Sequence, residues 1–108
     1  MKIKSGVELL SETLEVGQPA EKGALVKVRL NGWLSKGESI RQEPISEFVI
    51  GRRTVITGLE YAVEGMRTGG VRKVKISPHL AYKEQGVPGI IPANALLIYE
   101  IELLGIAN

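Results

Sequence analysis

The sequence predicts an α+β fold in which an antiparallel β-sheet is wrapped around one short α-helix. Several segments alternate apolar and polar residues with a period of two, which is typical of antiparallel strands with one buried face. One segment instead repeats its apolar residues with the spacing of a helix. The chain has 108 residues, enough for one hydrophobic core. We therefore expect residues 1–108 to form a single domain.

The first half of the chain reads as strands separated by turns. Residues 26–34 show the clearest alternation, with valine and leucine on one face and lysine, arginine and asparagine on the other. The segment 17–23 contains glycine and proline and is predicted to be a loop, and 35–37 is a hairpin-type turn. Further strands are predicted at residues 6–16, 38–41 and 48–50.

One segment has the features of a helix of about two turns. Thr57 and Glu60 have the spacing of a capping box, so we expect the Thr57 oxygen to accept a free amide and Glu60 to reach back to the helix start. Apolar residues then recur at helical spacing and predict one buried stripe. This stripe consists of Leu59, Ala62, Val63 and Met66.

Two more strands are predicted after the helix. Residues 71–77 form the first, which ends at a proline. Residues 95–104 form the second, and their near-continuous apolar start favours a central position in the sheet. The segment 83–92 lies between them and holds several glycines and prolines, so it is predicted to be a loop built from turns.

The composition leaves few reaction classes open. The chain has no cysteine, which excludes disulfides, thiol nucleophiles and thiolate metal sites. His79 is the single histidine and directly follows a proline, where a solvated turn residue is the expected role. No cluster of histidine and carboxylate residues has the spacing of metal ligands, and no glycine-rich segment forms a phosphate loop. We therefore expect neither a metal nor a cofactor.

Charge and hydropathy restrict the partners. The 14 basic and 12 acidic residues give a net charge of +2, and no block of five like charges occurs, so a nucleic-acid partner is not expected. No apolar run reaches the roughly 18–20 residues that a membrane span needs. The first residues lack the apolar core of a signal peptide. We expect a cytoplasmic protein without a membrane partner.

An apolar binding pocket is the remaining possibility. The loop 86–91 carries bulky aliphatic residues on a backbone stiffened by proline. Next to a tyrosine with an exposed hydroxyl, such residues could enclose a small apolar group and offer it one hydrogen bond. The same pattern also suits ordinary core residues, so for Ile90 and Ile91 both interpretations stay open.

Several motifs in sequence order resemble the FKBP family of peptidyl-prolyl cis-trans isomerases. They begin with the strand 26–34 and with Val-Ile-Thr-Gly-Leu-Glu at 55–60. Gly-Met-Arg-Thr-Gly-Gly and Ile-Ser-Pro-His-Leu-Ala-Tyr follow, and after them the loop and terminal strand that match the family's flap and last strand. The resemblance covers roughly residues 24–106 without a large insertion, and these later motifs occupy residues 65–70, 76–82, 86–95 and 97–104.

The resemblance implies a twisted antiparallel sheet curved around the helix, with a shallow apolar pocket that receives the substrate proline ring. Tyr82 matches the family tyrosine whose hydroxyl binds a carbonyl, and Ile56 matches the residue whose backbone amide does the same. These two are the catalytic candidates. The substrate-binding candidates are Leu30, Ile40, Phe48, Val55, Leu59, Ile91 and Tyr99.

This sequence departs from the family at the pocket. Leu30 stands where the family commonly has tyrosine, Ile40-Arg41 where it has a Phe-Asp pair, and Leu59 where it has the floor tryptophan; Tyr99 replaces the common phenylalanine. The aliphatic residues keep the pocket apolar but remove aromatic contact area. We therefore expect a peptidyl-prolyl isomerase with low activity toward X–Pro bonds of peptides and folding proteins, and weakened macrolide binding.

Two other functions remain possible from the sequence. A catalytically degenerate module could bind proline-containing peptides or unfolded segments, or act as a weak folding chaperone. Trp33 gives this alternative some support, because its parity places it with Lys27 and Arg29 on the face away from the pocket. A nucleic-acid-binding module is the third possibility, and it predicts binding that weakens steeply with salt.

Overall fold

The structure is a computed structural model that describes residues 2–40 and 44–107. It contains one sheet of seven strands, all of them antiparallel, and one α-helix, which confirms the predicted fold class. The sheet order is β1-β2-β6-β7-β3-β4, and β5 pairs with β3. The strands are β1 (Lys2–Lys4), β2 (Val7–Thr13), β3 (Leu25–Leu34), β4 (Ser39–Ile40), β5 (Ile45–Val49), β6 (Val71–Ile76) and β7 (Leu97–Ala107).

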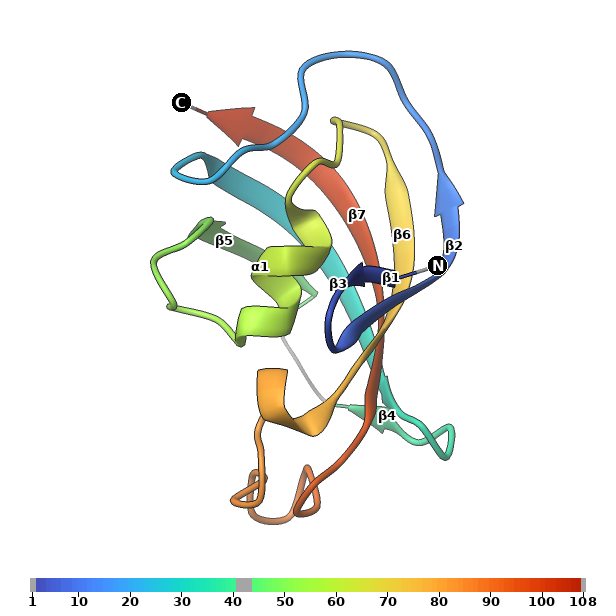
Figure 1. Ribbon diagram of the computed structural model, residues 1–108. Helices are drawn as coiled ribbons and strands as arrows, with labels where there is room; N and C mark the ends of the chain where they lie inside the picture. Colours follow the sequence, from blue (N-terminus) through green and yellow to red (C-terminus); the bar gives the residue numbers. More distant parts are fainter. Residues whose placement is uncertain (1, 41–43, 108) are drawn as a thin grey trace.

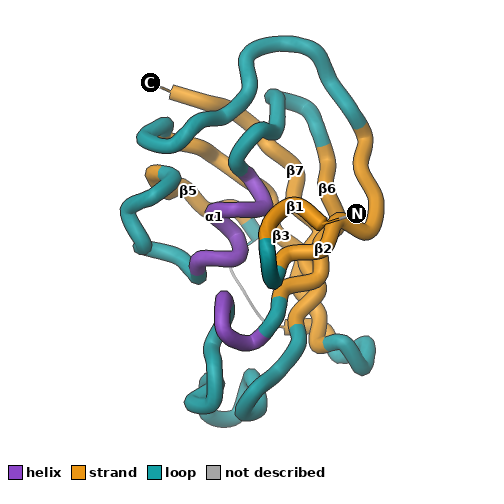
Figure 2. The backbone as a smooth tube through the Cα atoms, viewed as in Figure 1, coloured by secondary structure: helices purple, strands orange, loops and turns teal. Residues whose placement is uncertain are grey.

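The helix α1 (Thr57–Val63) lies against one face of the twisted sheet (Figure 1). The side chains predicted to be its apolar stripe are all buried: Leu59, Ala62, Val63 and Met66. A short 3₁₀-helix, η1 (Pro78–Leu80), follows β6 and was not predicted. Figure 2 shows that the loops gather mainly at the two ends of the sheet.

The strand β3 has the alternation that its sequence predicts. Its even-numbered residues from Val26 to Leu34 are buried, whereas Lys27, Arg29 and Asn31 are exposed. Trp33 shares the outward parity but is half-buried, and the Lys73 Nζ atom lies 5.7 Å from the centre of its ring. This cation–π contact covers the tryptophan within the protein itself.

The N-terminal strand differs from its prediction. In place of one strand over 6–16, a turn at Ser5 and Gly6 separates β1 from β2, and Gly6 has a φ of 91°, a conformation that favours glycine. Pairing with β6 ends where Thr13 meets Val71. Beyond that point Leu14 continues the apolar alternation without a partner strand and is 76 % exposed.

The capping-box prediction is wrong. The N-cap residue is Ile56 and makes no side-chain cap hydrogen bond, so Thr57 is already the first helical residue. A capping box would need Thr57 as the N-cap residue, but the helix begins one residue earlier. The Glu60 carboxylate therefore does not bind the helix start and points to the preceding loop. The C-terminal end of α1 is satisfied by Arg72 of β6, whose Nη1 donates to the carbonyls of Ala62 at 2.9 Å and Glu64 at 3.1 Å.

The last strand has the central place predicted for it. β7 pairs with β6 on one side and with β3 on the other. It starts at Leu97 and continues to Ala107, so it lies two to three residues later in the chain than its sequence pattern indicates. Its inward residues Leu97, Tyr99, Ile101 and Leu103 are completely buried. The core of the fold therefore lies between β7 and α1.

Candidate functional site

Most of the predicted pocket residues lie inside one apolar cluster of the core. The cluster is built from the inner face of the sheet, the buried side of α1 and the loop before β7. The exposed fractions of these residues are low: Leu30 6 %, Ile40 7 %, Phe48 3 %, Leu59 3 %, Ile91 5 % and Tyr99 0 %. A ligand therefore meets little of their surface in this conformation.

The other predicted residues form the rim of this cluster. Val55, Ile56 and Tyr82 are half-buried and pack against the buried apolar residues. Ile56 is the N-cap residue of α1, and Tyr82 follows shortly after η1. In Figure 1, η1 and the loop that continues from it lie beyond the N-terminal end of α1, so the helix start and the loop face the same region. A ligand can therefore reach these rim residues more readily than the buried cluster beneath them.

Two hydrogen-bond donors at this rim have no partner in the part of the chain that the structure describes. Within residues 2–40 and 44–107, the Ile56 N–H and the Tyr82 hydroxyl bond to no other group. The Ile56 carbonyl, in contrast, accepts the Leu59 N–H at 3.0 Å. Polar groups beside an apolar surface are normally satisfied within the protein or by water. These two donors are thus available to carbonyl oxygens of a bound peptide.

The loop after Tyr82 is held in place by its own backbone. Gly86 N–H donates to the Tyr82 carbonyl at 3.0 Å, and Val87 and Ile91 exchange two hydrogen bonds of 2.8 Å. A side chain at Gly86 would collide with the backbone of Ile91, and its φ of 60° also favours glycine. This arrangement gives the two neighbouring isoleucines different exposures. Ile91 points into the core, whereas Ile90 is 47 % exposed.

The replaced family aromatics leave a closed apolar surface. Leu30 and Leu59, which the sequence resemblance matches to the family tyrosine and tryptophan, both belong to the packed cluster. A leucine offers less contact area than either aromatic ring. Arg41, the other departure noted in the sequence, lies outside the described residues.

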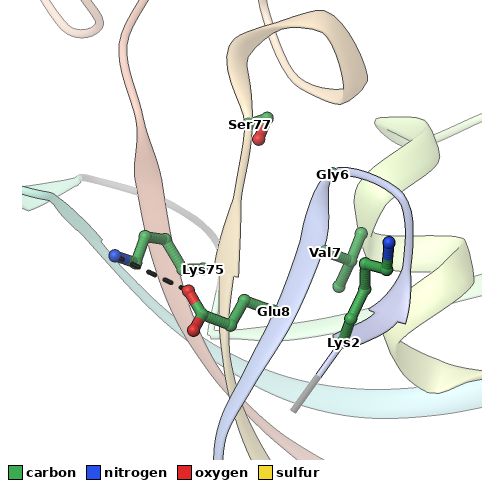
Figure 3. Close-up of a pocket in the computed structure, with 6 residues that line it drawn as sticks. All are labelled: Lys2, Gly6, Val7, Glu8, Lys75 and Ser77. Carbon is green, nitrogen blue, oxygen red and sulfur yellow. Dashed lines mark ion pairs between the residues drawn. The ribbon is translucent and has the colours of Figure 1, made fainter.

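Other hollows on the surface are lined by different residues. One of about 340 Å³ lies beside the β1–β2 hairpin, where the Lys75 Nζ and Glu8 Oε1 atoms are 3.7 Å apart (Figure 3). Another of about 350 Å³ lies between the β3–β4 turn and the segment before β7. Their residues are mixed in charge and bring no catalytic set together. The lining of the first is Lys2, Gly6, Val7, Glu8, Lys75 and Ser77.

The structure offers no metal centre or membrane-spanning helix in its described part. No group of three or more histidine and carboxylate residues there could hold a metal ion. His79 is exposed in η1, next to the turn at Gly6. Among residues 2–40 and 44–107, no helix is long and apolar enough to cross a membrane.

Sequence reasoning missed the role of one buried side chain. Glu60 is 2 % exposed, and its Oε2 atom accepts the backbone N–H groups of Gly51 and Arg53, both at 3.0 Å. Its helical position was predicted, but these partners were not. No local sequence signal could identify them, because the contact depends on how the loop after β5 folds back onto α1.

Comparison with known proteins gives consistent results. The family described as "FKBP-type peptidyl-prolyl cis-trans isomerase" matches residues 17–104 of the chain. "FK506-binding protein 1A" of Neurospora crassa is 43% identical over 90 residues, which are 79% of this chain and 74% of that protein. "FK506-binding protein" of Neisseria meningitidis is 37% identical over 93 residues, or 82% of this chain and 84% of that protein.

Longer proteins also contain a similar segment. "FK506-binding protein 4" of Gibberella zeae is 38% identical over 110 residues. The match covers 98% of this chain but 22% of that protein. The chain therefore spans about a fifth of the length of this relative.

Proposed function

Because this chain belongs to the FKBP-type peptidyl-prolyl cis-trans isomerase family, and is an isomerase of X–Pro bonds by that membership, we propose that the reaction takes place at the rim of the apolar cluster. In this proposal Val55, Ile56 and Tyr82 contact the substrate directly. The buried residues Leu59 and Ile91 support them from below. The observation that carries the proposal is the pair of unpartnered donors, Ile56 N–H and Tyr82 O–H, beside that cluster.

The mechanism requires no nucleophile and no proton transfer. Rotation about the amide has a barrier of about 18–20 kcal/mol, because the planar form is stabilised by resonance. An apolar surface disfavours the polar planar amide relative to the twisted one. Hydrogen bonds from Ile56 N–H and Tyr82 O–H to the flanking carbonyls then favour the twisted geometry, which is the form that an isomerase must stabilise.

We expect the activity to be low for the family. The walls formed by Leu30, Leu59 and Tyr99 are 0 to 6 % exposed, so the proline ring has mainly the rim to bind to. Burial of apolar area contributes roughly 25 cal/mol per Å², so the loss of a tryptophan platform costs on the order of 1–3 kcal/mol of binding. The same argument predicts that a macrolide of the FK506 type binds this chain weakly.

A second function is favoured by the same geometry. Free donors beside an apolar rim can hold proline-containing peptides or unfolded segments even where the ring fits poorly. The chain would then act mainly as a peptide-binding module or weak folding chaperone with little turnover. The low exposure of Leu30, Leu59 and Tyr99 favours this alternative. The Ile56 N–H and the Tyr82 hydroxyl favour catalysis.

One experiment separates these functions. NMR exchange spectroscopy on a short X–Pro peptide, with and without the protein, reports binding and cis–trans interconversion together. We expect peptide resonances to shift and the interconversion to become faster than its uncatalysed time of about 10–100 s. Shifts without acceleration would support the binding module, and the absence of both would contradict the proposed site.

A further inference from the structure

The most unusual buried group of the described protein is the carboxylate of Glu60. Among the described residues of the core, Glu60 is the charged residue that is buried, with 2 % of its surface exposed. The other buried residues of α1 are all small or apolar. Burying a carboxylate is unfavourable, and a well-packed apolar residue is often at least as stable. A role in stability alone therefore explains this residue poorly.

The partners of Glu60 indicate what it does. Its Oε2 atom accepts the N–H groups of Gly51 and Arg53, both at 3.0 Å. The Arg53 guanidinium adds little, because its Nε is 4.0 Å from Oε1 and its side chain is 69 % exposed. The carboxylate thus binds the backbone of the loop between β5 and α1, and the ion pair is secondary.

Burial holds this loop only weakly. Residues 51–54 are all exposed, and Gly51 and Arg53 have positive φ values of 97° and 60°. A positive φ is strained for arginine, so the conformation needs support from its surroundings. Within the described chain, the side-chain hydrogen bonds made by the backbone of this segment are the two to Glu60.

The loop leads directly to the proposed carbonyl-binding amide. Thr54 and Val55 are the residues between Arg53 and Ile56, whose N–H has no partner in the described chain. The carboxylate of Glu60 is itself held in place, because α1 is anchored by its buried apolar residues. Glu60 therefore fixes the distance and angle between the helix and the loop that presents the amide.

We infer that Glu60 is a positioning residue for the isomerase: its carboxylate holds the loop 51–55 so that Ile56 N–H and Val55 face the substrate. This role rests on the proposed function of Ile56. A displacement of a binding group by a fraction of an ångström is costly in rate. Loss of the Glu60 carboxylate should then lower the turnover rate by more than the accompanying loss of stability explains.

The test compares substitutions at Glu60 with a matched core control. Glu60→Met keeps the approximate volume but removes both acceptors. Glu60→Gln keeps a carbonyl oxygen that can accept both amides. Val63→Ala disturbs the same helix at a completely buried position outside the site. Rates on an X–Pro peptide are measured by NMR exchange and corrected for the folded fraction from urea unfolding.

The expected results differ among these variants. Glu60→Met lowers the rate per folded molecule about tenfold or more, Glu60→Gln restores most of it, and Val63→Ala leaves it within about twofold of the wild type. A wild-type rate in Glu60→Met, or an equal loss in Val63→Ala, contradicts the inference. If Glu60→Met does not fold, Glu60→Asp replaces it, because the shorter side chain keeps the charge but cannot reach both amides.

A second readout is independent of turnover. The ¹H–¹⁵N resonance of Ile56 and its hydrogen-exchange rate report the position and exposure of the amide. Both are expected to change in Glu60→Met and Glu60→Asp but not in Val63→Ala. If the wild type fails to accelerate any X–Pro peptide, the proposed function is wrong. An unchanged Ile56 amide in the Glu60 variants would instead overturn the positioning role.

Discussion

At the scale of single residues, the proposed site depends on two hydrogen-bond donors without a partner among the described residues. The Ile56 N–H and the Tyr82 hydroxyl have no partner in residues 2–40 and 44–107, although both belong to residues packed on the core. Leaving such donors free is unfavourable unless water or a ligand completes them. Their removal should therefore affect binding and catalysis without lowering stability.

Tyr82→Phe tests this expectation. The hydroxyl bonds to no described group, so the free energy of unfolding should change by less than about 0.5 kcal/mol. The isomerisation rate should fall by about twofold to tenfold, which corresponds to one neutral hydrogen bond. NMR exchange and urea unfolding measure the two quantities. A large loss of stability, or an unchanged rate, would show that the hydroxyl has another role.

Restoring the family residues at the pocket should increase activity. Leu59→Trp combined with Arg41→Asp restores the residue types that the resemblance gives the family at these two sequence positions, so the rate constant and macrolide affinity are expected to rise about tenfold. Calorimetry and NMR exchange measure the change. Leu59→Met is the control, since it keeps the volume without a ring and should match the wild type. Equal behaviour of all three proteins would disprove this account.

The residues of the proposed site came from a family resemblance, and their exposure could be predicted from the sequence only in part. Period-two alternation places Leu30 on the inner face of β3 and predicts its burial. The opposite orientations of Ile90 and Ile91 follow from backbone hydrogen bonds between Val87 and Ile91. Neither pattern nor composition encodes such a turn, so this part of the site could not be predicted.

At the scale of elements, the contact between α1 and β6 is unusually close. Gly58 is buried in the first turn of the helix, and an added Cβ atom would collide with the Ile76 side chain. The missing side chain lets the helix approach the sheet. The helix stripe and most strands were predictable because they follow regular periods. The start of β5, the end of β7 and η1 were not, since pairing partners and turns determine them.

Gly58→Ala is expected to destabilise the protein, although alanine is the better helix former. The helix preference would gain about 1 kcal/mol, but the collision with Ile76 costs more, so a net loss of about 1–3 kcal/mol is expected from urea unfolding. The double variant Gly58→Ala, Ile76→Ala should lose less than the sum of the two single variants. If the stability losses of the two single variants simply add in the double variant, the destabilisation does not come from the contact between residues 58 and 76.

At the scale of the whole molecule, charge is distributed evenly and the proposed site is apolar. The chain has 14 basic and 12 acidic residues, and ion pairs on the outer face of the sheet join Arg29 Nη1 to Glu102 Oε1 at 3.1 Å and Lys75 Nζ to Glu8 Oε1 at 3.7 Å. The sheet order could be predicted only in part. The apolar start of β7 indicated its central place, but nothing local in the sequence shows that β2 pairs with β6.

Peptide binding should therefore depend little on salt. Between about 50 and about 500 mM salt we expect the affinity for an X–Pro peptide to change by less than about twofold, because no charged contact carries the binding. Fluorescence titration or NMR measures it. A single-stranded DNA oligomer is the comparison. Tight binding of the oligomer with a steep salt dependence would support a nucleic-acid module instead.

The central position of β7 also determines when the protein can fold during its synthesis. A ribosome adds about 5–20 residues per second, and residues 97–107 emerge only after β3 and β6 have been made. Until then β6 and β3 have no strand between them, and both present unpaired edges and apolar faces to their surroundings. The sheet therefore cannot be completed before β7 has been synthesised.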